Sequence, residues 1–255
     1  MHRDSVISID MGGTKVLGCV VNSKEGIIAS VKKPTDPTVS RKKYVHQLAE
    51  IVFELIEEAH VNRKKIKAVC LGVPGLVNPH TGIIGLAPNL GLKNFNIKKS
   101  LEAEVPYPVL IENDVNLGAL GIKTFGVGKK ARNMLAVFVG TGIGGGLIID
   151  GKLYRGSNYV AGEIGHTLVE KNGPKCGCGR KGCFEAIASR TAIVNKIIKD
   201  IKSGKRSKLS KLVKSGERIR SKSLSSAVKS GDKVARRRIK EGCDVIGGTL
   251  ASITN

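Results

Sequence analysis

The 255-residue sequence has no long hydrophobic run, and only 4% of its residues are aromatic. No stretch approaches the roughly 18 consecutive apolar residues that a membrane-spanning helix needs, so we expect no membrane partner. Residues 1–4 lead directly into a strand pattern, and nothing there resembles a signal peptide. Because these absences give no indication of export, we expect a cytoplasmic protein whose six cysteines are reduced.

Acidic residues are scarce, with 21 Asp or Glu against 43 Lys or Arg and a formal net charge of +22. Residues 196–241 alone contain 17 basic and four acidic residues. Such an excess is compatible with contact to a polyanion, either nucleic acid or polyphosphate. The segment has no Phe, Tyr or Trp on which bases could stack, which favours a solvated basic face on a partly helical chain. We therefore expect no nucleic-acid partner.

Strand and helix patterns alternate along the first part of the chain. We expect strands at 6–10, 16–22, 26–32, 68–73 and 108–111, and helices at about 41–60 and from about 115 onward. His46 and His60 lie off the apolar face of the first helix, so we expect them at the surface. Three strands, a helix and a strand are typical of a ribonuclease-H-like opening, and in such sheets ligands gather at the carboxyl ends of the strands.

The first strand ends in Asp10, and the turn Gly12-Gly13-Thr14-Lys15 leads into the second. Glycines let backbone N–H groups approach a phosphate closely, while Thr14 adds a hydroxyl donor and Lys15 a positive charge. Asp10 lies where the water shell of a magnesium ion could be held. The turn therefore predicts a phosphate-binding hairpin.

A second hairpin repeats this pattern later in the chain. The apolar strand 134–139 runs into Gly140, Thr141 and Gly142, and a strand at 147–150 follows. Two such hairpins facing each other across a cleft would hold a nucleotide's phosphates from both sides, as phosphoryl transfer requires. We expect further helices at about 189–203 and 232–253.

The strand at 108–111 ends in Glu112-Asn113-Asp114. Asp114 stands at a strand end beside a helix start, where it can meet a substrate hydroxyl, so it is the candidate general base. The same position favours an N-cap aspartate, and the two interpretations are compatible.

The segment 163–185 carries one histidine and three cysteines, which are the ligand types of a tetrahedral structural zinc site. These candidate ligands are His166, Cys176, Cys178 and Cys183. A closed Cys3His shell leaves no position for substrate water, so such a zinc would be structural. The alternative is buried free thiols or a disulfide, although pairing would leave one clustered cysteine over. The dispersed cysteines lie in apolar segments and are expected in the core: Cys19, Cys70 and Cys243.

Two carboxylates, Glu163 and Glu185, bracket the cysteines. A loop held by metal would present both at defined positions, and carboxylates that accept hydrogen bonds from vicinal hydroxyls are what a sugar site needs. The alternative is two solvated surface glutamates.

Taken in order, the two hairpins, Glu-Asn-Asp after a strand, Gly-Glu-Ile-Gly-His and Cys-x-Cys-x4-Cys resemble the ROK family of sugar kinases and repressors. The resemblance covers essentially the whole chain. It implies an actin-like ATPase fold of class α/β, with two ribonuclease-H-like domains, and also a homodimer. We expect these domains at 1–118 and 119–255, with the zinc loop at 163–185 and the basic helical segment at 196–241.

The resemblance further implies an ATP-dependent hexose kinase that uses Mg²⁺ and a structural Zn²⁺ and phosphorylates glucose or a related (N-acetyl)hexosamine. Asp114 would be the base for the sugar's 6-hydroxyl, and His166 would bind the sugar through the ring nitrogen that is not on zinc. The implied sugar-binding residues are Asn89, Asn113, Asp114, Glu163, His166 and Glu185. The implied phosphate-binding residues are Asp10, Gly12, Gly13, Thr14, Lys15, Gly140, Thr141 and Gly142.

Both ends of the chain differ from the family pattern. Family repressors carry a winged helix-turn-helix before the first hairpin, whereas this chain starts four or five residues before its first strand, so we expect no such module. Family members usually continue past a segment like 251–255, so we expect a missing C-terminal segment. The alternatives are a sugar-binding regulatory protein without turnover and a kinase that uses polyphosphate as phosphoryl donor.

Overall fold

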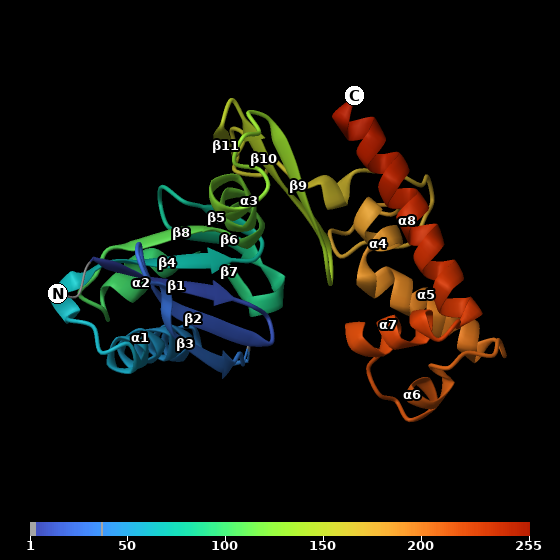
Figure 1. The fold of residues 1–255 in the computed structure, drawn as a ribbon, viewed down its shortest axis with the longest axis horizontal. Helices are drawn as coiled ribbons and strands as arrows, with labels where there is room; N and C mark the ends of the chain where they lie inside the picture. Colours follow the sequence, from blue (N-terminus) through green and yellow to red (C-terminus); the bar gives the residue numbers. More distant parts are fainter. Residues whose placement is uncertain (1–3, 37) are drawn as a thin grey trace. The chain divides into compact units, whose positions relative to one another are not determined.

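A computed structural model of the chain describes residues 4–36 and 38–255 (Figure 1). The chain divides into two compact units. The first comprises Met1–Leu135 and Gly146–Ala161, and the second comprises Ala136–Gly145 and Gly162–Asn255. Across the described ranges, no helix is long and apolar enough to cross a membrane.

A five-stranded sheet of order β3-β2-β1-β4-β8 forms the centre of the first unit (Figure 1). Its strands are β1 (Ser5–Met11), β2 (Lys15–Asn22), β3 (Gly26–Pro34), β4 (Ile66–Val73) and β8 (Val109–Asn113). β1, β2 and β3 form antiparallel pairs, whereas β4 pairs in parallel with both β1 and β8. The register places Gly72 between Asp10 and Glu112, so the carboxyl ends of three parallel strands meet at one edge.

Helix α1 (Arg41–Glu58) packs on β2 and β3 and buries the apolar face that its spacing predicts (Figure 1). The Ser40 hydroxyl caps it by accepting a hydrogen bond from the backbone N–H of Lys43. Gly18 on β2 lets the helix approach closely, because a Cβ there would lie 2.8 Å from Leu55 Cδ1. His46 and His60 are exposed, as expected.

The remaining elements of the first unit surround this sheet. A small antiparallel sheet consists of β5 (Leu76–Asn78), β6 (Ile83–Ala87) and β7 (Leu92–Asn96). The helical segments are η1 (Arg63–Lys65), η2 (Pro88–Leu90), α2 (Ile97–Glu102) and α3 (Asp114–Phe125). A third sheet, whose residues belong partly to the second unit, contains β9 (Met134–Val139), β10 (Ile143–Ile149) and β11 (Lys152–Tyr154). Because Gly146 has no Cβ, α3 approaches β10 closely at Ala119.

The rest of the second unit is mainly helical. Its elements are η3 (Ile164–His166), α4 (Phe184–Ala188), α5 (Arg190–Lys202), α6 (Ser210–Lys214), α7 (Ser221–Lys229) and α8 (Lys233–Thr254). Ile197 and Ala235 are fully buried where α5 and α8 pack against each other. Helices α6 and α7 lie inside residues 196–241, which confirms the expectation of a partly helical basic segment.

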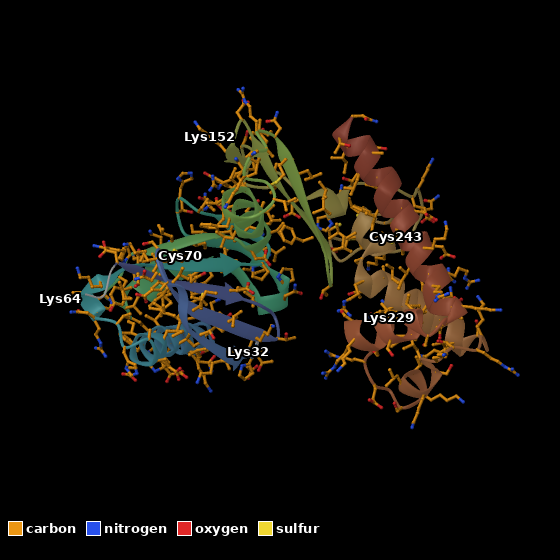
Figure 2. All side chains as sticks on the ribbon, in the orientation of Figure 1. Lys32, Lys64, Cys70, Lys152, Lys229 and Cys243 are labelled. Carbon is orange, nitrogen blue, oxygen red and sulfur yellow. The ribbon has the colours of Figure 1, made fainter. Side chains whose placement is uncertain are left out.

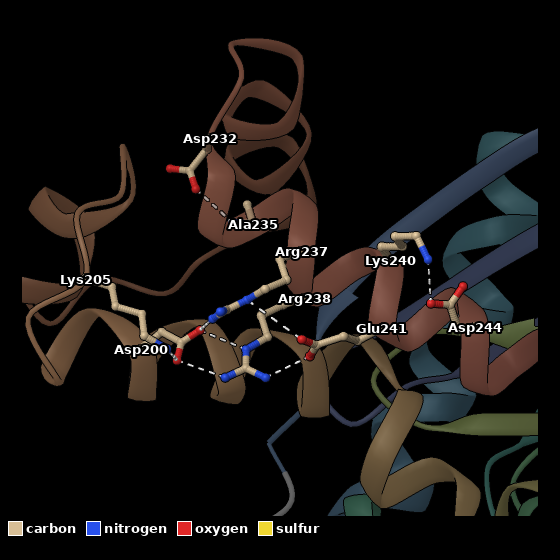
Figure 3. Close-up of polar contacts among 9 residues, drawn as sticks. All are labelled: Asp200, Lys205, Asp232, Ala235, Arg237, Arg238, Lys240, Glu241 and Asp244. Carbon is tan, nitrogen blue, oxygen red and sulfur yellow. Dashed lines mark hydrogen bonds and ion pairs between the residues drawn. The ribbon is translucent and has the colours of Figure 1, made fainter.

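A nearly buried carboxylate ties α8 to α5 (Figure 3). Asp200, whose side chain is 5% exposed, accepts two hydrogen bonds from the Arg238 guanidinium at 2.8 Å. Arg237 and Lys205 each contribute a further contact at 2.6 Å. These hydrogen bonds, those of Arg238 first, hold the pKa of Asp200 well below its usual range.

Two sequence expectations are corrected. Cys243, labelled on α8 in Figure 2, is exposed to solvent and is therefore not a core residue. The strand expected at 147–150 begins earlier, at Ile143, because its glycines continue the extended pairing of β10. The other expected strands and helices are present, with ends that differ by at most two residues.

Candidate active site

The candidate base Asp114 lies at the carboxyl edge of the first unit's sheet, directly after β8. It is half-buried, and this desolvation raises the pKa of its carboxyl. The negative charge of Asp10 raises it further, while a hydrogen bond from the backbone N–H of Val115 opposes both effects. A raised pKa makes Asp114 a stronger proton acceptor than an ordinary aspartate.

Asn113 is the N-cap of α3, so the interpretation of Asp114 as the N-cap is wrong. The Asn113 Oδ1 accepts from the backbone N–H of Asn116 at 3.0 Å, and its Nδ2 donates to the Gly75 carbonyl at 3.0 Å. These contacts hold Asn113 in place beside the candidate base and occupy part of its capacity to bind a ligand.

Asp10 is the penultimate residue of β1 and lies at the same edge of the sheet. Its side chain is exposed, yet desolvation by the surrounding strand ends raises the pKa of its carboxyl, against the opposing charge of Lys15. Gly72 lies between Asp10 and Glu112 in the sheet, and a Cβ on it would lie 3.9 Å from the Asp114 Cα. An exposed carboxylate at this position fits the expected role of holding the water shell of Mg²⁺.

The predicted phosphate hairpin is a tight turn between β1 and β2. The Gly12 N–H donates to the Lys15 carbonyl at 2.9 Å, and the Thr35 hydroxyl donates to the Gly12 carbonyl at 2.7 Å. Asn89 lies directly against this turn, because a Cβ on Gly13 would come within 2.9 Å of the Asn89 carbonyl oxygen. The structure therefore brings Asn89 to the hairpin, although 76 residues separate it from Gly13.

The turn of the second predicted hairpin lies in the second unit and is held by Glu185. The Glu185 Oε2 accepts a hydrogen bond from the Ile143 N–H at 2.9 Å. Gly142 makes room for this carboxylate, since a Cβ there would lie only 2.1 Å from the same oxygen. Glu185 is thus no free surface glutamate, although its role toward a ligand stays a prediction.

The four predicted metal ligands converge in the second unit. The ligand atoms of His166, Cys176, Cys178 and Cys183 all lie within 4.8 Å of one another. Cys178 and Cys183 Sγ are 3.7 Å apart, and Cys176 Sγ lies 3.6 Å from His166 Nδ1. In a tetrahedral zinc site with Zn–S bonds of about 2.3 Å, neighbouring ligand atoms are about 3.8 Å apart. The two observed distances are close to this value. All six cysteines are free thiols in the structure.

The metal loop depends on glycines where its backbone turns. Gly179 and Gly182 have φ angles of 92° and 75°, and a Cβ on Gly182 would collide with the Glu170 carbonyl oxygen. The Arg180 backbone N–H, followed by its guanidinium, lowers the pKa of Cys178 to about 6. Desolvation, followed by hydrogen bonds with the neighbouring thiols, raises the pKa of Cys183 to about 12, so the two thiols differ in how readily they ionise.

His166 presents its two ring nitrogens to different partners. Nδ1 faces Cys176, whereas Nε2 lies 3.8 Å from the Glu163 carboxylate. With Nδ1 on a metal, Nε2 would remain available to a ligand beside Glu163, as the resemblance implies.

The expected sugar-binding residues fall into two groups. Asn89, Asn113 and Asp114 lie in the first unit, and Glu163, His166 and Glu185 lie in the second. That both groups contact one sugar stays a prediction.

Sequence reasoning missed the ion pair of Glu112 and Arg155. The Arg155 Nε donates to the Glu112 Oε2 at 2.7 Å across a separation of 43 residues. Glu112 belongs to the Glu-Asn-Asp motif, and this position could have marked it as a functional residue. No local pattern marks Arg155.

An α/β fold with glycine hairpins and a Cys3His loop defines a class of actin-like sugar kinases and regulators. The chain belongs to the ROK family, whose sequence profile matches residues 6–255. A glucokinase from Streptomyces griseus, solved with glucose and AMPPNP, superposes with a TM-score of 0.84 at 32% identity and covers 98% of this chain and 78% of its own. This similarity confirms the actin-like fold class.

Curated relatives carry two kinds of names. The glucokinase of Halalkalibacterium halodurans is 33% identical over 205 residues, which are 80% of this chain and 62% of that protein. The xylose repressor of Caldicellulosiruptor bescii is 34% identical over 200 residues, which are 78% of this chain and 50% of that protein. The chain thus spans about 60% of the length of such glucokinases and half that of such repressors.

Proposed function

We propose that the protein acts as a sugar kinase that transfers the γ-phosphoryl group of ATP to the 6-hydroxyl of glucose or a related (N-acetyl)hexosamine. The observation that carries this proposal is the position of Asp114 together with the raised pKa of its carboxyl. It lies outside the helix cap, at the edge where three parallel strands end, and its pKa is raised by desolvation and by Asp10. The glucose and AMPPNP bound to the Streptomyces griseus glucokinase support this substrate pair.

In the proposed reaction, Asp114 accepts the proton of the sugar hydroxyl while the oxygen of that hydroxyl forms a bond to the γ-phosphorus of ATP. The bond between the γ-phosphorus and the oxygen of the leaving ADP breaks in the same step. The backbone N–H groups of the Gly12–Gly13 turn and the charge of Lys15 stabilise the phosphate oxygens. Mg²⁺, held through water by Asp10, would neutralise further phosphate charge. A structural zinc on the Cys3His set would hold the loop between Glu163 and Glu185, so that their carboxylates can bind sugar hydroxyls.

A second candidate is a sugar-binding regulatory protein without turnover, favoured by the similarity to xylose repressors. A third candidate is a sugar kinase that uses polyphosphate instead of ATP as its phosphoryl donor. The basic residues of 196–241 would then bind the polyphosphate.

Coupled ADP release with ATP, Mg²⁺ and a panel of glucose, N-acetylglucosamine, N-acetylmannosamine, mannose and fructose tests the proposal. A sugar-dependent rate supports the kinase and names its substrate. Sugar binding by calorimetry without any rate favours the regulatory protein instead. Glucose 6-phosphate formed from polyphosphate without ATP would identify the alternative donor. Light scattering after size exclusion would test the expected homodimer.

A further inference from the structure

Glu112 is nearly buried and forms an ion pair with the partly exposed Arg155, and the proposed reaction does not use this pair. The Glu112 side chain is 10% exposed and that of Arg155 is 35% exposed. Glu112 Oε2 accepts from Arg155, while Oε1 accepts from the Asn113 N–H at 2.9 Å and from the Asn116 Nδ2 at 3.0 Å. A carboxylate with three donors is well satisfied, so its burial is tolerated in this geometry.

One side of this pair fixes the start of α3. Glu112 binds groups of Asn113 and Asn116, and Asp114 lies between these two residues. Asn113 in turn binds the Asn116 N–H and the Gly75 carbonyl. The Glu112 carboxylate therefore holds the backbone N–H just before the candidate base and the side-chain amide of Asn116 just after it.

The other side of the pair fixes the loop 155–161. The Arg155 carbonyl accepts a hydrogen bond from the Ala161 N–H at 3.0 Å, which closes the loop. Gly156 and Tyr159 adopt left-handed backbone angles of 70° and 59° within it. The first unit ends at Ala161, and the predicted sugar ligand Glu163 follows two residues later.

We infer that Glu112 and Arg155 are positioning residues that jointly anchor the strand end bearing Asp114 and the loop that leads into Glu163. This inference rests on the proposed function for the reaction that it serves. Neither side chain is assigned a contact with substrate. Their effect is to hold other groups in the productive geometry, and displacements of about 1 Å can cost about 100-fold in rate.

Kinetics of Arg155→Met, Arg155→Lys and the control Arg132→Met test the inference on folded protein. Arg132 belongs to the same unit and pairs with Asp150 at 2.9 Å, but both side chains are largely exposed. Arg155→Met should lower kcat and raise the sugar KM, so that kcat/KM falls about 10- to 100-fold. Arg155→Lys keeps the charge and should restore part of this loss. Arg132→Met should stay within about twofold of the wild type.

Backbone amide exchange gives a readout that needs no turnover. The Asn113 N–H donates to the Glu112 carboxylate, and the Ala161 N–H donates to the Arg155 carbonyl. Arg155→Met should therefore speed hydrogen exchange at both amides, and Arg132→Met should not. Wild-type kcat and KM in Arg155→Met, or unchanged exchange at either amide, would overturn the inference. If the wild-type protein phosphorylated no sugar, the proposed function would fail, and the exchange result would still decide whether the pair positions both segments.

Discussion

Asn113 caps helix α3 and leaves the adjacent Asp114 carboxylate outside the cap. The Asn113 Oδ1 binds the third N–H of the helix at 3.0 Å, a contact that an N-terminal aspartate often makes. The Asp114 carboxylate accepts hydrogen bonds from the N–H of its neighbour Val115 and from its own backbone N–H. Asn113 therefore stabilises the start of the helix, and the carboxylate of Asp114 remains available to act as a base.

Asp114→Asn should abolish phosphoryl transfer and spare sugar binding. Asparagine cannot take the hydroxyl proton, and loss of a general base costs about 100- to 10,000-fold in kcat. Because the folded-state pKa of Asp114 is raised, its charge costs stability near neutral pH, so the variant should melt no lower than the wild type. Steady-state kinetics, calorimetry with sugar and thermal melts measure the three effects, and appreciable residual turnover would remove Asp114 from the role of base.

The acid limb of the kcat/KM profile should lie above the ordinary aspartate pKa of about 3.9. Asp114 is inactive when protonated, and its pKa is raised, so activity is lost as pH falls through that raised value. Asp10→Asn removes a negative charge that raises this pKa, so the limb should move to lower pH. Profiles of both proteins, with carboxyl NMR titration of Asp114, provide the test, and a shift to higher pH in Asp10→Asn would contradict it.

Cys178→Ser should lower zinc content and raise the sugar KM. Removing one of four converging ligands weakens the metal site and loosens the loop between Glu163 and Glu185. Cys243→Ser is the matched control, since Cys243 is exposed on α8 and should change neither quantity. Metal analysis and steady-state kinetics measure the outcome, and an unchanged sugar KM in zinc-free protein would disprove the link between metal and sugar.

Gly142→Ala should impair catalysis more than Gly140→Ala. A Cβ at residue 142 would lie 2.1 Å from the Glu185 Oε2, so this carboxylate must leave the Ile143 N–H. A Cβ at residue 140 would meet no atom within 4 Å. We expect a loss of about 10-fold or more in kcat/KM for the first variant, as small displacements at a site are costly. Equal activity of the two variants would show that the Glu185 contact is dispensable.

Asp200→Asn should destabilise the second unit by about 3 kcal/mol, at the low end for breaking a buried pair because Arg237 and Lys205 are half-exposed. The lowered pKa of Asp200 contributes stability above the unfolded-state pKa, and this contribution is lost as pH falls through the folded-state value. Urea unfolding at several pH values measures both effects. Asp244→Asn breaks an exposed pair with Lys240 within α8 and should lower the stability far less than Asp200→Asn does.

Local patterns in the sequence determined much of the fold and of the metal site. Helical spacing of apolar residues predicted α1 nearly to its ends, and glycine turns between apolar runs predicted the hairpin of β1 and β2. The cysteine spacing, with its glycines, predicted the convergence of the metal ligands. These signals are readable because each depends on residues within about twenty positions of one another.

Only the tertiary structure decided the contacts between distant segments. The Glu112–Arg155 pair spans 43 residues, and the contact of Asp200 with Arg238 spans 38. The sequence allowed either Asn113 or Asp114 as the N-cap of α3. In the structure Asn113 is the cap, and its Nδ2 also donates to the distant Gly75 carbonyl. Such outcomes follow from which elements pack together and from which buried polar atoms then find partners, and no local spacing encodes either.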